Sequence, residues 1–218
     1  MASRGRQLVK TIFNTDNKVM KVCERIFDFI CLNLIFLLSC LPIITIGVAR
    51  ISLYYVLDQM KRTQHVSILK EYFYSFRLNF KIGFSLFLIE LAVVGIIGLD
   101  LYLIHAQTIF TFTAMKAICI GLLFLVSLFA LIIYPLASSK EYQLKALLKI
   151  TLLQLSFNIF KSFLLLLIFI VLIFVYFSSV FTLVFGSLFL LIAGFSTLAS
   201  IQLTIIDKMI TPKLDEVL

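Results

Sequence analysis

Charged residues are scarce in this sequence. They make up 14% of its 218 residues, and hydrophobic residues make up 62%, whereas a soluble domain has about 25% charged residues. So few charges cannot supply the polar coat that a soluble protein of this size needs. The apolar residues, 23 phenylalanines among them, instead form runs long enough to cross a bilayer. We therefore predict an all-α, polytopic transmembrane bundle that forms a single domain over 1–218.

Residue types that carry catalysis or bind metals are also few. The two histidines, His65 and His105, provide no histidine-based metal site or catalytic triad. None of the four cysteines stands in a Cys-x-x-Cys pair, so we interpret them as small apolar residues. There is no P-loop, Gly-x-Ser-x-Gly or His-Glu-x-x-His motif. We expect no enzyme activity, no cofactor and no metal site. Nucleic-acid binding is disfavoured because the basic residues follow the membrane boundaries.

The apolar runs predict six spans arranged as three hairpins. The second span is the weakest, because it contains Arg50 and Asp58 and is only about 27 Å long at 1.5 Å per residue. A plain hydropathy reading fuses 26–48 into one span and leaves 49–81 as a loop, which gives five spans. The six predicted spans are 26–41, 43–60, 82–104, 117–137, 162–180 and 183–206.

Positive charge favours six spans over five. With six spans and a cytosolic N-terminus, all of the 19 lysines and arginines except Arg50 and Lys116 lie on the cytosolic side. Five spans would place one of the two most basic segments outside. The first apolar run begins near Ile26 with no cleavage site after it, so we expect no cleaved signal. The expected location is the bacterial cytoplasmic membrane, with 1–25 and 207–218 in the cytosol.

A tight outer turn is predicted between the first two spans. Proline lacks an N–H group and suits the first turn of a new helix. Pro42, Thr45 and Gly47 are therefore assigned to this turn. The other outer connections are His105–Lys116 and Ser178–Thr182.

Two cytosolic segments, 66–80 and 141–160, are predicted to be basic amphipathic helices. In the first, the apolar residues recur at helical spacing and the basic residues take another side. Such helices bind the anionic inner leaflet or a groove on a partner protein. They are either interfacial connectors against membrane lipid or docking elements for a cytosolic partner. The residues expected to contact a partner are Phe73, Phe76, Arg77, Lys81, Lys145 and Lys149.

The same two segments end alike. Ser75–Lys81 and Leu155–Lys161 share a pattern of asparagine, phenylalanine and lysine, and each leads into a span. An internal duplication is one explanation of this short match.

Ionisable residues inside the spans are functional candidates, because charge in hydrocarbon is unfavourable. The candidates are Arg50, Glu90 and Asp100. Arg50 and Asp100 lie at similar predicted depths, which allows an ion pair; a solute or proton site is the alternative. Glu90 has no evident partner, and protonation, packing against Asn33 and exposure to water are all left open.

Several short elements resemble the YesL family of bacterial membrane proteins, a domain of unknown function. They are Phe13–Asn17, Asn33, the Leu41–Gly47 turn with Leu53–Val56 after it, Phe76–Phe80 and Gly194–Ser196. The family has small residues after the turn glycine, so Arg50 departs from its pattern.

The resemblance implies a setting beside carbohydrate ABC importers and glycan-degrading enzymes. The hypothesis is a non-catalytic accessory subunit that contacts the permease pair or the ATPase through the amphipathic helices. The alternative is a stand-alone secondary transporter or channel for a small solute. The absence of tryptophan and the few polar residues at the midplane argue against a sugar path.

Overall fold

A computed structural model describes residues 18–63, 65–105, 110–139 and 143–210. In these ranges every regular element is a helix, which confirms the predicted all-α class. The N-terminal segment up to residue 17 and the tail from residue 211, both predicted to be cytosolic, lie outside the described residues. The elements are α2 (Lys18–Ser39), the 3₁₀ helix η1 (Ile43–Thr45), α3 (Ile46–Arg62), α4 (Ile68–Leu78), α5 (Phe80–Ile104), α6 (Phe110–Ser139), α7 (Leu144–Phe157), α8 (Ile159–Phe177), α9 (Val180–Phe189), the π-helix η2 (Leu190–Gly194) and α10 (Phe195–Ile210).

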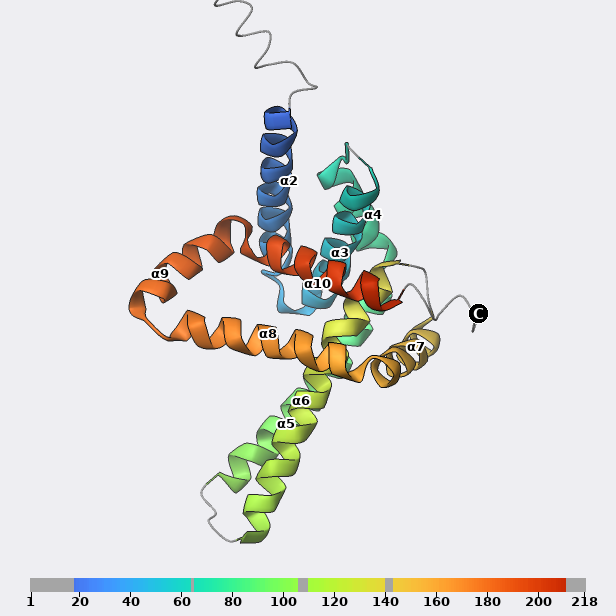
Figure 1. The fold of residues 1–218 in the computed structure, drawn as a ribbon. Coiled ribbons are helices and arrows are strands. Elements are labelled where there is room, and N and C mark those ends of the chain that lie inside the picture. Colours follow the sequence, from blue (N-terminus) through green and yellow to red (C-terminus); the bar gives the residue numbers. More distant parts are fainter. Residues whose placement is uncertain (1–17, 64, 106–109, 140–142, 211–218) are drawn as a thin grey trace, which may run out of the picture.

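The chain order gives the three predicted hairpins (Figure 1). The short η1 joins α2 to α3, α6 follows α5, and α8 is followed by a long bent helix made of α9, η2 and α10. The connectors α4 and α7 occupy the places predicted for the amphipathic helices. Figure 1 shows the α5–α6 hairpin projecting from the rest of the molecule, with α8 running across α6.

Within the described residues, five helices are long and apolar enough to cross a membrane. This result supports the predicted membrane bundle. The five segments are Ile43–Arg62, Phe80–Ile104, Phe112–Ser139, Ile159–Phe177 and Val180–Lys208.

The predicted span that falls short is 26–41, not 43–60. Helix α2 begins earlier than predicted and carries Glu24, Arg25 and Asp28 in its first half. Its apolar part after Asp28 is only about 17 Å long, against about 30 Å for the hydrocarbon core.

Helix α3 forms the centre of the protein. Of the five candidate spans, the one that contains α3 has the lowest mean hydropathy. It is nevertheless the most buried, because 56% of its apolar stretch lies inside the protein. Its buried side chains include Val48, Ile51, Val56 and Leu57, and α4, α5, α6 and α10 pack around it. A helix surrounded by protein needs fewer apolar residues, because its polar groups bond to neighbouring helices instead of facing lipid.

The closest approach in this core joins α3 to α5. A Cβ atom added to Gly83 would lie 2.7 Å from the Cα atom of Val48, and one added to Gly47 would collide with the carbonyl oxygen of Gly83. Because neither residue has a side chain, the two backbones are in direct contact. Small residues have this role where helices pack tightly in membranes.

This contact also sets the relative heights of two hairpins. The Leu41–Gly47 turn lies against the first turns of α5, since Gly47 meets Gly83. The connection after α5 begins near His105, about 33 Å farther along the helix. The predicted topology has both connections at the same outer surface, but the structure separates them.

The turn itself agrees with the prediction. Pro42 precedes the 3₁₀ helix in an extended conformation, and α3 begins at Ile46. The hydroxyl oxygen of Thr45 lies 2.6 Å from the carbonyl oxygens of Ser39 and Pro42. The Pro42 carbonyl already accepts from the backbone N–H of Thr45, so the hydroxyl proton can serve the Ser39 carbonyl at the end of α2.

The two similar sequence motifs occupy equivalent places. Asn79 separates α4 from α5, and Asn158 separates α7 from α8. The backbone carbonyl of each asparagine accepts a hydrogen bond from the backbone N–H four residues later. The donors are Gly83 at 2.8 Å and Ser162 at 3.0 Å. The motifs therefore mark the junction of an amphipathic helix with an apolar one, as predicted.

The orientation of α4 differs from the prediction. Its buried residues are Ile68, Tyr72 and Ser75, whereas the apolar residues Leu69, Phe73 and Phe80 of the predicted stripe are exposed. The basic residues lie beside Phe73 and not on a separate side. Both lysines of α7 are exposed as predicted, but so are Leu152 and Phe157, and the polar residues Thr151 and Gln154 are buried.

We predict that Gly83→Ala destabilises the protein by about 1–3 kcal/mol, because the new methyl group forces two backbones apart. Gly95→Ala is the matched control on the same helix, where an added Cβ meets nothing within 4 Å. The control should be neutral or slightly stabilising. Unfolding in lipid bicelles, followed by the reaction of newly exposed thiols, measures both changes. Equal effects of the two substitutions would contradict the close contact.

Candidate functional site

Three polar side chains from three helices meet beside the glycine contact. Arg50 of α3 lies 3.3 Å from the Oε2 atom of Glu90 on α5 and 3.4 Å from its Oε1 atom. The hydroxyl of Tyr134 on α6 donates to Oε2 of Glu90 at 2.5 Å. The guanidinium carbon of Arg50 lies 3.8 Å above the centre of the Tyr134 ring. These three residues are called the polar triad below.

The triad corrects the predicted pairing of the intramembrane charges. Arg50 pairs with Glu90 and not with Asp100, which is exposed and lies about 15 Å farther along α5. Arg50 reaches Glu90 and not Asp100 because α3 packs against the N-terminal part of α5. Glu90 does not pack on Asn33 either, because Asn33 bonds to a different helix.

The triad brings opposite charges together in partly buried positions. The side chains of Arg50 and Glu90 are 26% and 27% exposed. Removing one partner is destabilising, because the remaining charge is left uncompensated. The Tyr134 ring adds a cation–π contact, and its hydroxyl adds a charge-assisted hydrogen bond. The arrangement holds α3, α5 and α6 together and leaves the pair with no net charge.

A second polar connection begins at a proline. Pro135 lies inside α6 and has no N–H group, so the carbonyl of Leu131, four residues earlier, lacks its helical partner. The side-chain amide of Gln202 on α10 donates to this carbonyl at 2.6 Å. The carbonyl oxygen of Gln202 in turn accepts from the hydroxyl of Tyr54 at 2.8 Å. One buried glutamine therefore connects α10, α6 and α3.

A third polar connection joins α2 to the π-helix η2. The Asn33 amide nitrogen donates to the carbonyls of Leu190 and Leu191, at 2.9 and 2.8 Å. The Asn33 carbonyl oxygen accepts from the backbone N–H of Ser196 at 3.1 Å. Asn33 is fully buried and replaces backbone hydrogen bonds that the irregular turn interrupts. It joins two elements that the sequence analysis had noted separately, Asn33 itself and Gly194–Ser196.

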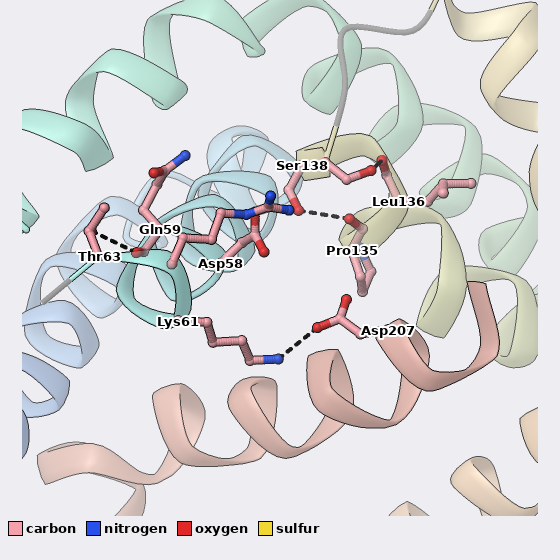
Figure 2. Close-up of polar contacts among 10 residues, drawn as sticks. Asp58, Gln59, Lys61, Thr63, Pro135, Leu136, Ser138 and Asp207 are labelled. Carbon is pink, nitrogen blue, oxygen red and sulfur yellow. Dashed lines mark hydrogen bonds and ion pairs between the residues drawn. The ribbon is translucent and has the colours of Figure 1, made fainter. Parts of the chain in front are cut away.

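Ion pairs lie at the C-terminal end of α3. Lys61 donates to Asp207 of α10 at 2.9 Å (Figure 2), and Arg62 donates to Asp58 one turn earlier in α3 at 2.8 Å. In Figure 2 Lys61 reaches across from α3 toward Asp207, and the hydroxyl of Ser138 points to the carbonyl of Pro135. These groups are partly exposed, and such pairs contribute little to stability.

The exposed side of α4 is an open surface formed by residues of this one helix. Phe73 is 50% and Tyr74 55% exposed, and Lys70 and Arg77 flank them on this surface. Tyr72 points the other way into the core, where burial raises the pKa of its hydroxyl. Phe76 stacks on Tyr72 and packs against the core, so it is less accessible than predicted.

The remaining site predictions fall in different places. Lys81 is exposed at the start of α5, and Lys145 and Lys149 are exposed on α7, away from the polar triad. Sequence reasoning missed Tyr134 and Gln202. Pro135 was the available signal for Gln202, because a proline inside an apolar helix predicts a free carbonyl four residues earlier.

Groups suited to metal binding are not brought together in the described part of the chain. No cluster of three or more His, Cys, Asp or Glu side chains is found there. Of the two histidines, His65 lies 3.0 Å from Glu24 in the first half of α2, and His105 follows α5.

Comparison with known proteins gives one match. Residues 29–101 match the family model described as "Protein of unknown function, DUF624". The matched region runs from within α2 to near the end of α5, so it includes Asn33, the Pro42–Gly47 turn, Arg50, Glu90 and α4. Tyr134, Gln202 and η2 lie outside it. No curated protein and no solved structure matches the chain.

We predict that Tyr134→Phe lowers the free energy of unfolding by about 1.5–3 kcal/mol, because the Glu90 carboxylate loses a hydrogen bond. Tyr102→Phe removes the same hydroxyl from a side chain that is 79% exposed, and it should change stability by no more than about 0.5 kcal/mol. Unfolding in bicelles measures both. A loss for Tyr134→Phe no larger than that for Tyr102→Phe would show that the hydroxyl does not support the triad.

Proposed function

We propose that this protein is a non-catalytic membrane subunit that binds partner proteins through α4. Its partners are the permease and ATPase subunits of a carbohydrate ABC importer. The observation that carries the docking role is the exposed aromatic and basic surface of α4. The choice of partner rests on the resemblance to the YesL family. The match to a family of unknown function over residues 29–101 is compatible with that resemblance and includes the whole of α4.

Several features of α4 support docking. The helix is held from one side by the core through Tyr72, Ile68 and Ser75. A docking surface built on such a fixed helix loses little conformational entropy on binding. The outer side combines exposed aromatic rings with an arginine, the residue types that contribute most energy at interfaces. Lys70 and Arg77 fit a partner surface that carries carboxylates.

The proposed membrane orientation places α4 where such partners are found. The positive-inside rule puts α4 and α7 on the cytosolic side of a bacterial cytoplasmic membrane. This orientation does not depend on whether the α2–α3 hairpin crosses the bilayer, because a hairpin returns the chain to the side from which it entered. Lys145 and Lys149 of α7 then face the cytosol as a second basic surface. We propose that both chain termini are cytosolic.

A transporter is the second candidate, and the polar triad is the observation that favours it. Charged residues within candidate spans often mark ion or proton paths. Against this role, Arg50 and Glu90 already neutralise each other. The cavity beside them is lined by apolar side chains apart from Glu90 and Tyr134. A sugar path requires many more polar groups.

We predict that tagged protein extracted from its native membrane in nanodiscs carries stoichiometric permease and ATPase subunits. Phe73→Ala and Arg77→Ala should each reduce their recovery about tenfold or more, because both remove groups at the centre of the exposed surface of α4. Phe174→Ala on α8 removes a ring that is 74% exposed and should leave recovery unchanged. Quantitative mass spectrometry of the captured proteins is the measurement.

Two results would contradict the docking proposal. One is recovery of the protein alone or as a homo-oligomer. The other is unchanged recovery of partners with both α4 variants, combined with weaker binding of those variants to vesicles containing phosphatidylglycerol. That second result would assign the exposed surface of α4 to lipid headgroups. Solute flux by the purified protein alone would favour the transporter.

A further inference from the structure

A cavity of about 140 Å³ lies between α5 and α6, beneath Leu148 of α7. Its walls are apolar side chains such as Leu86, Val93 and Val126, and Glu90 and Tyr134 supply its polar groups. Two lining residues, Ile89 and Leu125, are 45% and 52% exposed. The cavity therefore opens to the surface of the hairpin, which consists of two candidate membrane spans.

The size of the cavity defines the body of a ligand. An apolar cavity of about 150 Å³ in a protein stays free of water and binds benzene. The walls here are of the same kind, so a single ring or a short branched chain fits. A sugar does not fit, because its many hydroxyl groups would find few partners among these walls.

Glu90 defines the polar group of the ligand. Its Oε2 atom already accepts from Tyr134 at 2.5 Å and lies 3.3 Å from Arg50. Its Oε1 atom has a longer contact, 3.4 Å from Arg50. A carboxylate has about four lone-pair positions for hydrogen bonds. Oε1 therefore retains capacity to accept a bond from a donor in the cavity.

The charge of the ligand follows from the other side of the triad. The Arg50 guanidinium lies over the Tyr134 ring and disfavours a second cation nearby. The Glu90 carboxylate disfavours an anion. Since the pair is already neutral, a neutral ligand leaves the electrostatic balance of the site unchanged.

We propose that this cavity is a binding site for a small neutral molecule with a ring-sized apolar body and one O–H or N–H donor. The apolar body fills the space between α5 and α6, and the donor bonds to Oε1 of Glu90. The ligand enters from the hydrocarbon phase, where such molecules partition. This site does not depend on the proposed docking role of α4.

The test compares phenol with anisole, which has the same ring but no donor. Saturable binding to the protein in nanodiscs of phosphatidylcholine and phosphatidylglycerol is measured by saturation-transfer NMR, with empty nanodiscs as the background for partitioning. Phenol should bind about tenfold more tightly than anisole, the preference expected for a hydrogen bond to a carboxylate. Equal affinities would overturn the role of Glu90.

Two substitutions test the location. Ala130→Leu and Val126→Phe each fill the cavity and should abolish saturable binding of phenol. Ala117→Leu makes the first change at an exposed position of the same helix and should leave binding intact. Saturable binding that persists in both filling variants, or its absence in the unmodified protein, would overturn the proposed site.

The role of Glu90 is tested with the double variant Arg50→Met/Glu90→Leu, which removes the acceptor without leaving an unpaired charge. The cavity walls remain, so anisole should still bind. The roughly tenfold preference for phenol should disappear. A preference that survives would assign the hydrogen bond to another group.

Discussion

Every backbone N–H and C=O group in an apolar environment needs a hydrogen-bond partner, and two irregular helices of this protein meet this requirement in the same way. Pro135 frees the carbonyl of Leu131, and Gln202 from α10 satisfies it. The π-helix interrupts the regular bonding at Leu190–Gly194, and Asn33 from α2 satisfies the groups concerned. In each case a local irregularity in one helix requires an amide from another helix, so local defects determine which helices pack together.

These amide contacts place α3 where the polar triad can form. Gln202 also binds Tyr54 of α3, while Gly47 and Gly83 bring α3 and α5 into backbone contact. Arg50 then reaches Glu90 and Tyr134. With its other side packed on α3, α4 exposes Phe73 and Arg77 to the surroundings. The exposed surface of α4 and the cavity beside Glu90 therefore both depend on the same buried contacts.

Local features were predictable from the sequence, and relative positions were not. Long apolar runs predicted the hairpins, Pro42 predicted the turn, and the two asparagine motifs predicted helix junctions, because each depends on nearby residues. The predicted Arg50–Asp100 pair was wrong because the prediction assumed that all outer connections lie at the same depth in the membrane. The sequence contains one sign that α3 packs against the N-terminal turns of α5, which is that Gly47 and Gly83 have no side chains. The exposed face of α4 was misjudged for a similar reason, since burial depends on where α3 lies.

The most direct test of this account is a double-mutant cycle between Pro135→Ala and Gln202→Leu, measured by unfolding in bicelles. Gln202→Leu alone should destabilise the protein by about 1–3 kcal/mol, because it leaves a buried carbonyl without a partner. Pro135→Ala restores the N–H group that can bond to Leu131, so in that background the loss should be at least about 1 kcal/mol smaller. Losses that agree within about 0.5 kcal/mol in the two backgrounds would show that the sites are independent. That result would contradict the claim that Gln202 is held in place by the carbonyl that Pro135 frees.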